Sequence, residues 1–164
     1  MKKDPIEIDD DEMEEFPPAE QEIAKAHQLF LSNGSFSEIN DLIWFGCRFH
    51  TTEPIYVPGS LSLAFDLYDK YKDTNPKEVV PHCMLLLGRI FNAKGEFLPA
   101  CRFFLCAQKL FKDSHWIIAM EFFREELRTP EAMSQIGLSR EEFRKKYKKD
   151  RPQALVEQYR HSVP

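Results

Sequence analysis

The stretch PHCMLLLGRIFNAKGEFLPACRFFLCAQKLFK, residues 81–112, decides the fold. Apolar residues recur in it at intervals of three and four, which is the period of a helix with one buried face. Gly95 interrupts the pattern, and glycine most easily adopts the left-handed conformation that ends a helix. The stretch therefore predicts a helix up to Lys94, a tight turn, and a second helix from about Phe97 to Phe111 that folds back on the first.

Small and large residues occupy fixed offsets along these two predicted helices. Gly88 and Ala100 have little or no side chain, so the helices can approach closely where they cross. Leu87, Phe91 and Phe104 are large enough to fill the space beside that crossing. The pattern resembles the tetratricopeptide repeat, a helix-turn-helix of about 34 residues. The positions that match its signature are Met84, Leu87, Gly88, Phe91, Gly95, Ala100, Phe104 and Ala107.

A degraded copy of the same pattern precedes this stretch. The loop inside it, TTEPIYVPGS at residues 51–60, is longer than in the repeat, and Gly46 and Gly88 lie 42 positions apart. A generic bundle of amphipathic helices would give similar apolar spacing without any repeat, and the sequence leaves that alternative open. The matches to the first helix are Leu42, Phe45, Gly46 and Phe49, and those to the second helix and its terminal proline are Ala64, Tyr68, Tyr71 and Pro76.

The rest of the chain also predicts helices, because no long segment alternates apolar and polar residues with period two. We expect an all-α fold, a tetratricopeptide-like stack of antiparallel helix pairs. Its parts are a disordered acidic tail (1–17), the tetratricopeptide-like helical domain (18–127) and a helical C-terminal extension (128–164). Asn33-Gly34 should end one helix, and Pro81 should kink or restart another. Residues placed to begin helices are Ser35, Ser60, Ser114, Pro130 and Ser139.

Composition and motifs exclude several classes of function. The formal net charge of −5 argues against nucleic acid as the main ligand. The longest uncharged apolar run, residues 81–88, is too short to span a membrane. We find no nucleophile–base pair, phosphate-binding loop or metal-ligand set, so we expect no enzymatic activity, cofactor or metal. The cysteines lie among apolar neighbours and form no CxxC pair, as in reduced core residues of a cytoplasmic protein; they are Cys47, Cys83, Cys101 and Cys106.

In a repeat stack, the first helix of each pair lines a concave surface that can hold an extended peptide or a helix. Arg89 and Asn92 would then hydrogen-bond a peptide backbone or a carboxylate, while Leu85 and Ile43 would accept apolar anchors. Solvated surface is the other interpretation of Arg89 and Asn92. The complete set expected to line this groove is Asn40, Ile43, Cys47, His50, His82, Leu85, Arg89 and Asn92.

Residues 20–127 as a whole resemble the class II, tetratricopeptide-type chaperones of bacterial type III secretion. The resemblance is most specific from Gly88 to Ala107, and LCAQKLFKDSHW (105–116) fits the run from the last repeat into a closing helix. The long loop at 51–60 and the long segment after residue 128 depart from that group.

This resemblance implies a cytoplasmic chaperone or adaptor that contributes to virulence. It would hold a secreted client, as an extended apolar segment or a helix, without inserting into a membrane, and it leaves a homodimer open. An exported effector or adaptor that uses the repeat as an interaction module is an alternative role, as is a structural subunit of a secretion complex.

Overall fold

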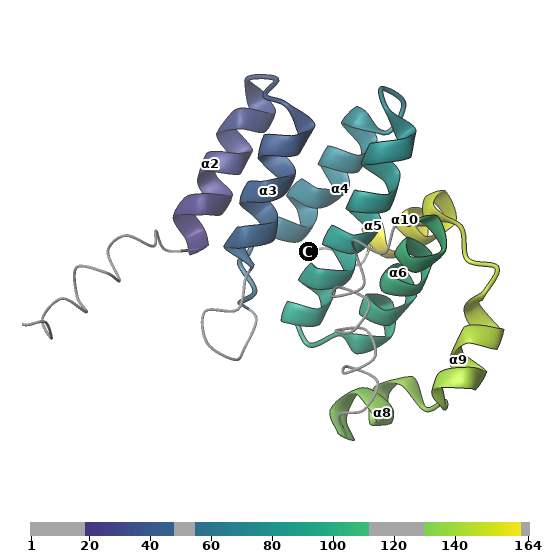
Figure 1. Ribbon diagram of the computed structural model, residues 1–164. Coiled ribbons are helices and arrows are strands. Elements are labelled where there is room, and N and C mark those ends of the chain that lie inside the picture. The colour runs from purple at the N-terminus through teal and green to yellow at the C-terminus, as the bar shows by residue number, and fades with distance from the viewer. Residues whose placement is uncertain (1–18, 48–54, 112–129, 162–164) are drawn as a thin grey trace, which may run out of the picture.

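A computed structural model describes residues 19–47, 55–111 and 130–161, and every regular element in those residues is an α-helix (Figure 1). This confirms the predicted all-α fold, whereas the tetratricopeptide-like stacking stays a prediction. The described helices are α2 (Ala19–Leu31), α3 (Phe36–Gly46), α4 (Ser60–Tyr71), α5 (Pro76–Ala93), α6 (Phe97–Leu110), α8 (Pro130–Ile136), α9 (Arg140–Tyr147) and α10 (Pro152–Arg160).

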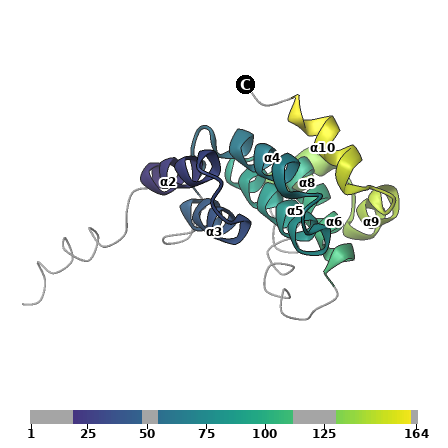
Figure 2. The same ribbon diagram turned by 90° about the horizontal axis from the view of Figure 1, so that it is seen from above.

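Helices α2 to α6 follow one another across the molecule, and the three C-terminal helices gather around α6 (Figure 1). Helix α5 packs most extensively against α6, α3 packs most extensively against α2, and α3 also contacts α5. Helix α10 reaches both α4 and α6. In both views α2 lies at one end of the molecule and α9 at the other (Figure 2). Helices α3 and α5 therefore form the middle of the molecule, and they carry the site described below.

The predicted hairpin of α5 and α6 is present. Gly95 has a φ of 82°, the left-handed conformation expected of it. A Cβ atom added at Gly88 would lie only 2.6 Å from Cδ1 of Phe104, so the ring of Phe104 occupies the space at Gly88. Helix α5 continues through Pro81, which excludes the predicted restart but leaves the alternative, a kink, as a prediction. The signature residues in the two helices are all buried, namely Met84, Leu87, Gly88, Phe91, Ala100, Phe104 and Ala107.

In the upstream copy, α3 contacts α4 but packs more extensively against α2. A Cβ atom added at Gly46 would lie 2.9 Å from Cδ1 of Ile23, so the close approach at this glycine is with α2 and not with Ala64 of α4. Phe45, predicted to point inward, is 51% exposed. The reason is that α3 turns one apolar face towards α2 and another towards α5, and the repeat pattern accounts for only one neighbour.

Most of the predicted helix ends are correct. Asn33 takes a φ of 63° after α2, and the Ser35 hydroxyl accepts a hydrogen bond from the backbone N–H of Glu38 at 3.2 Å. Ser139 and Glu142 form a complete capping box at the start of α9. Helix α4 also begins at Ser60 as predicted, but the cap position is Gly59, and the Ser60 hydroxyl donates to the carbonyl of Val57 at 2.7 Å.

Some predictions fall outside the described residues. These are the acidic tail at 1–17, His50 and Phe49 after α3, and the helix predicted to begin at Ser114 with Trp116, Ala119, Met120 and Phe123.

The segment after residue 128 shares the core of the preceding helices. Its residues Ala132, Ile136, Phe143, Leu155 and Val156 are buried in the same apolar cluster as those of α5 and α6. The predicted boundary near residue 128 is therefore not a boundary of the packed core.

Polar side chains hold this segment in place. Arg102 of α6 donates to both carboxylate oxygens of Asp150, at 3.0 and 2.9 Å, and to the hydroxyl of Tyr159 at 3.0 Å. The amide of Gln135 on α8 accepts from the N–H of Phe97 at 2.8 Å and donates to the carbonyl of Gly95 at 2.9 Å. It thereby satisfies backbone groups that the turn between α5 and α6 leaves open.

Candidate peptide-binding groove

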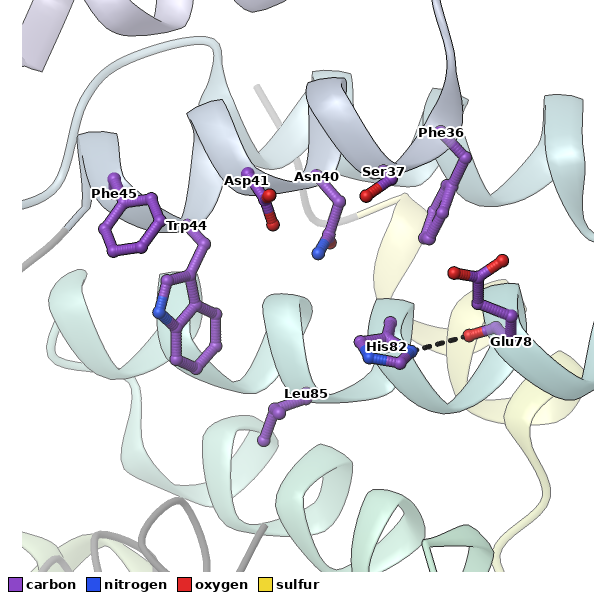
Figure 3. A pocket seen from close by; sticks show the side chains of 9 residues that line it. All are labelled: Phe36, Ser37, Asn40, Asp41, Trp44, Phe45, Glu78, His82 and Leu85. Carbon is purple, nitrogen blue, oxygen red and sulfur yellow. Dashed lines mark hydrogen bonds between the residues drawn. The ribbon is translucent and has the colours of Figure 1, made fainter. Parts of the chain in front are cut away.

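A pocket of about 310 Å³ lies between α3 and α5 (Figure 3). We call it the α3–α5 groove. Six of its residues come from two adjacent rows of α3, and three come from one face of α5. The residues that line it are Phe36, Ser37, Asn40, Asp41, Trp44, Phe45, Glu78, His82 and Leu85.

The groove has two chemically different ends. Figure 3 shows Phe36 opposite Glu78 and Trp44 opposite Leu85, so the two helices run in the same direction. Nine helical steps separate Phe36 from Phe45, which corresponds to roughly 13 Å along α3. An extended chain covers that length with about four residues. The groove is therefore long enough for a short peptide segment, with an aromatic end at Trp44 and a polar end at Glu78.

Asn40 provides a buried polar group in the middle of the groove. Its side chain hangs from α3 towards α5 (Figure 3), and the residue is 9% exposed. Within the described part of the chain, its Oδ1 atom accepts no hydrogen bond. A buried acceptor left without a donor costs free energy, so a donor supplied by a bound segment would be favourable here.

His82 lies across the groove from α3. Its Nδ1 is 2.8 Å from the carbonyl oxygen of Glu78, and its ring meets that of Phe111 edge to face with centroids 5.1 Å apart. These contacts hold the imidazole on one side of the pocket, where it contributes shape and a polar edge.

Arg89 holds the two helices together at the aromatic end. Its Nε donates to the carbonyl of Trp44 at 3.1 Å, and its guanidinium carbon lies 4.0 Å from the centroid of the Trp44 ring system. The residue is 7% exposed, and burial lowers the pKa of its side chain to about 10. This is a correction to the expectation that Arg89 offers its charge to a ligand, because the side chain is instead engaged in linking α5 to α3.

The structure places the eight residues predicted to line a groove in different environments. Asn40, His82 and Leu85 do line the α3–α5 groove. Ile43 and Cys47 are fully buried core residues and present no surface to a partner. Burial also raises the pKa of the Cys47 thiol, which keeps it protonated.

Asn92 is buried as well, at 6% exposure, and is not among the residues that line the pocket. His50 lies outside the described residues. The prediction assigned Arg89 and Asn92, which follow Leu85 on α5, to the surface, whereas the structure has both of them inside.

Sequence reasoning missed six residues of the groove. A signal for them exists in α3, where Trp44 and Phe45 add a second apolar row beside Ile39 and Ile43. A helix that is apolar on two faces requires two neighbours or one neighbour and a partner. The missed residues are Phe36, Ser37, Asp41, Trp44, Phe45 and Glu78.

A second hollow, of about 620 Å³, lies on the α2 and α4 side of the molecule. Its buried lining residues, Ile23, Val57 and Leu63, are apolar, and its polar lining residues are all exposed. It therefore lacks the buried polar group that distinguishes the α3–α5 groove.

Among the described residues, no helix is both long and apolar enough to cross a membrane, and no three histidine, cysteine or acidic side chains converge as metal ligands would. No family model, curated protein or solved structure matches the chain. The residues of the α3–α5 groove are therefore the basis for assigning a function.

Proposed function

We propose that the chain is a protein-binding chaperone or adaptor that holds a segment of a client protein in the α3–α5 groove. The observation that carries this proposal is the exposed aromatic surface next to the buried acceptor of Asn40. Phe45 is 51% exposed, and it lines the pocket together with Trp44. Exposed aromatic surface beside a polar group that lacks a donor is what a segment with apolar side chains and backbone N–H groups would cover.

The size of the effect can be estimated from Phe45. Burying a complete phenylalanine side chain stabilises a complex by up to about 3 kcal/mol. Since half of Phe45 is already covered, its remaining surface contributes roughly 1.5 kcal/mol, or about tenfold in affinity. Phe45 is therefore the side chain whose loss should weaken binding most clearly without emptying the core.

The nature of the client follows from the sequence resemblance. The stretch from Gly88 to Ala107 is similar to the tetratricopeptide-type chaperones of type III secretion, and this supports a cytoplasmic role and a secreted client. Such a client would expose apolar segments before export, and the groove would shield one of them from water.

A photo-crosslinking amino acid placed at Phe45 tests the groove directly. The matched control is the same amino acid at Met133, which is 43% exposed on α8 and is not among the residues that line the groove. We expect one partner to be captured from position 45 and not from position 133. The purified partner should then bind Phe45→Ser about tenfold more weakly than Met133→Ser in a titration.

Equal capture from both positions, or equal affinity of the two serine variants, would contradict the assignment of the groove. The identity of the captured partner separates the roles. A protein encoded beside this chain and released on export indicates a chaperone, whereas a permanent complex of fixed ratio indicates a structural subunit. A host protein indicates an exported effector.

A further inference from the structure

The charged side chains of the α3–α5 groove are all acidic. Asp41 on α3 and Glu78 on α5 are both exposed, and no lysine or arginine is among the nine residues that line the pocket. One carboxylate oxygen of Glu78 accepts a hydrogen bond from the Asn75 amide at 3.1 Å, a neutral donor that leaves the charge uncompensated. Side chains of one sign around a concave surface produce a potential that favours ligands of the other sign.

The helix dipoles do not reverse this sign. The first turns of α3 and α5 lie at the same end of the groove, and each N-terminus carries about half a positive charge. Two such ends supply about one unit, while Asp41 and Glu78 supply two negative charges. Glu38, which does not line the pocket, adds a third carboxylate in the first turn of α3, and the guanidinium of Arg89 against Trp44 adds one positive charge at the aromatic end. The sum over the whole groove is thus net negative.

The spacing between the acidic and aromatic parts sets the spacing within a ligand. Asp41 and Phe45 are four residues apart on α3, about 6 Å along its axis. Glu78 and Leu85 are seven residues apart on α5, about 10 Å. An extended chain covers these lengths in two or three residues. Along the groove Asn40 lies between Glu78 and Leu85, on the Glu78 side of Asp41 (Figure 3), and its buried oxygen accepts no hydrogen bond within the described residues.

We infer that the groove selects an extended segment with a lysine or arginine two or three residues from an apolar side chain. The apolar side chain packs against Trp44, Phe45 and Leu85. The cation faces Asp41 or Glu78, which lie at different heights of the groove, and a backbone N–H of the segment donates to Asn40. The same charges disfavour acidic segments, including the chain's own residues 9–15, which contain six carboxylates. This inference rests on the proposed function and specifies its partner.

A library of random twelve-residue peptides displayed on phage is the probe. It is selected on the immobilised full-length protein after depletion on the Phe45→Ser variant. We expect the enriched peptides to combine leucine, methionine, isoleucine or phenylalanine with a lysine or arginine at the stated spacing, and to lack clustered aspartate and glutamate. Enrichment of acidic or uncharged apolar peptides would overturn the inference while the groove itself stood. Equal retention by wild type and Phe45→Ser would remove the proposed function as well.

Charge-neutral variants then test the role of the carboxylates. The Asp41→Asn, Glu78→Gln double variant should bind an enriched basic peptide at least about tenfold more weakly at low salt, with the difference shrinking at high salt. The control Glu131→Gln, Glu141→Gln removes two exposed carboxylates from α8 and α9 and should bind as wild type. Equal loss of peptide affinity in both double variants would show that only the net charge of the protein matters, and this would overturn the inference. Unchanged affinity in both double variants would overturn it as well.

Asn40→Ala separates the hydrogen bond from the charges. It should weaken the binding of the basic peptide and the binding of its lysine-to-alanine counterpart by the same factor, about fivefold. The reason is that both peptides supply the same backbone N–H. Unchanged binding of both peptides would remove Asn40 from the recognition.

Discussion

Gly88 is buried where α5 crosses α6, and the ring of Phe104 lies against its Cα. The atoms Cδ1 and Cε1 of that ring would be 2.6 and 2.7 Å from a Cβ at this position, closer than carbon atoms approach without repulsion. The sequence indicated that position 88 is small so that the helices can approach closely, and that Phe104 is among the large residues that fill the space beside the crossing. It could not show that the ring lies directly against Gly88, because that contact depends on the crossing geometry.

Gly88→Ala should therefore destabilise the protein although alanine is the better helix former. The gain in helix propensity is about 1 kcal/mol, while overpacking a buried contact costs about 1–3 kcal/mol and forces Phe104 to move. We expect a net loss of the order of 1 kcal/mol in the free energy of unfolding, measured by urea titration.

Phe104→Leu provides the control for that substitution. Alone it should destabilise the protein by removing buried surface, but combined with Gly88→Ala it should cost less than the sum of the two. Strict additivity would show that the methyl group and the ring do not compete for the same space.

Two arginines tie the C-terminal helices to the body, and they differ in burial. The pair of Arg102 with Asp150 has side chains 12% and 16% exposed, whereas the pair of Arg160 with Asp69 has side chains 28% and 35% exposed. Both are two-pronged. Arg102 also lies 4.5 Å from the centre of the Tyr147 ring. Hydrogen bonds with Asp150 raise the pKa of Arg102 although burial opposes this.

Arg102→Ala should cost more stability than Arg160→Ala. Removing one partner of a largely buried pair leaves the other charge without compensation, and we expect a loss of about 2–4 kcal/mol at Arg102. The more exposed pair is screened by water, and its loss should be about 0.5–1 kcal/mol. Equilibrium unfolding of both variants in the same buffer makes the comparison.

Arg102→Lys is the intermediate case, because lysine keeps the charge but cannot bind both carboxylate oxygens in a planar fork. A free energy of unfolding near that of wild type for Arg102→Lys would mean that the charge alone, without the planar fork, holds α6 to Asp150.

At the level of elements, sequence reasoning succeeded where the signal is local. Asn33, Ser35, Gly95 and Ser139 end or begin helices as predicted, because capping and left-handed turns depend on a few consecutive residues. It failed where a helix chooses between neighbours. The apolar stripe of α3 is compatible with packing on either α2 or α4, and only the assembled fold decides that Gly46 faces Ile23.

The candidate site shows the same division. The pairing of α3 with α5 followed from the repeat pattern, and three of the eight predicted groove residues line the pocket. Arg89 and Asn92 are polar, so hydropathy assigned them to the surface. Their burial depends on tertiary contacts such as the stacking of Arg89 on Trp44, which no sequence period encodes.

At the scale of the whole molecule, the described residues share one apolar core that extends past residue 128. Tyr159 of α10 packs its ring against Phe91 and Phe103, with centroids 5.7 and 5.8 Å away, and Leu155 and Val156 are buried beside them. The sequence suggested a separate helical extension because this segment lies beyond the part of the chain that matches the repeat. Its few apolar residues are nevertheless those that close the core.

A chain ending at residue 129 should therefore be much less stable than the full chain. Removal of α8 to α10 uncovers the aromatic cluster. A decrease of about 4 kcal/mol in the free energy of unfolding would lower the melting temperature by roughly 10 °C. Thermal denaturation followed by circular dichroism, together with the binding of an apolar dye, measures this.

Leu155→Ala in the full chain is the matched point variant, with an expected loss of about 3 kcal/mol. Cooperative melting of the shortened chain at the temperature of the full chain would show that the C-terminal helices are dispensable for the core.

The tie between Arg89 and Trp44 has a consequence for the speed of recognition. Since it fixes the spacing of α3 and α5 at the aromatic end before anything is bound, a ligand needs to order only itself and not the receptor. Among segments of equal charge, encounter rates should then vary little, and good and poor sequences should differ mainly in how long they stay bound.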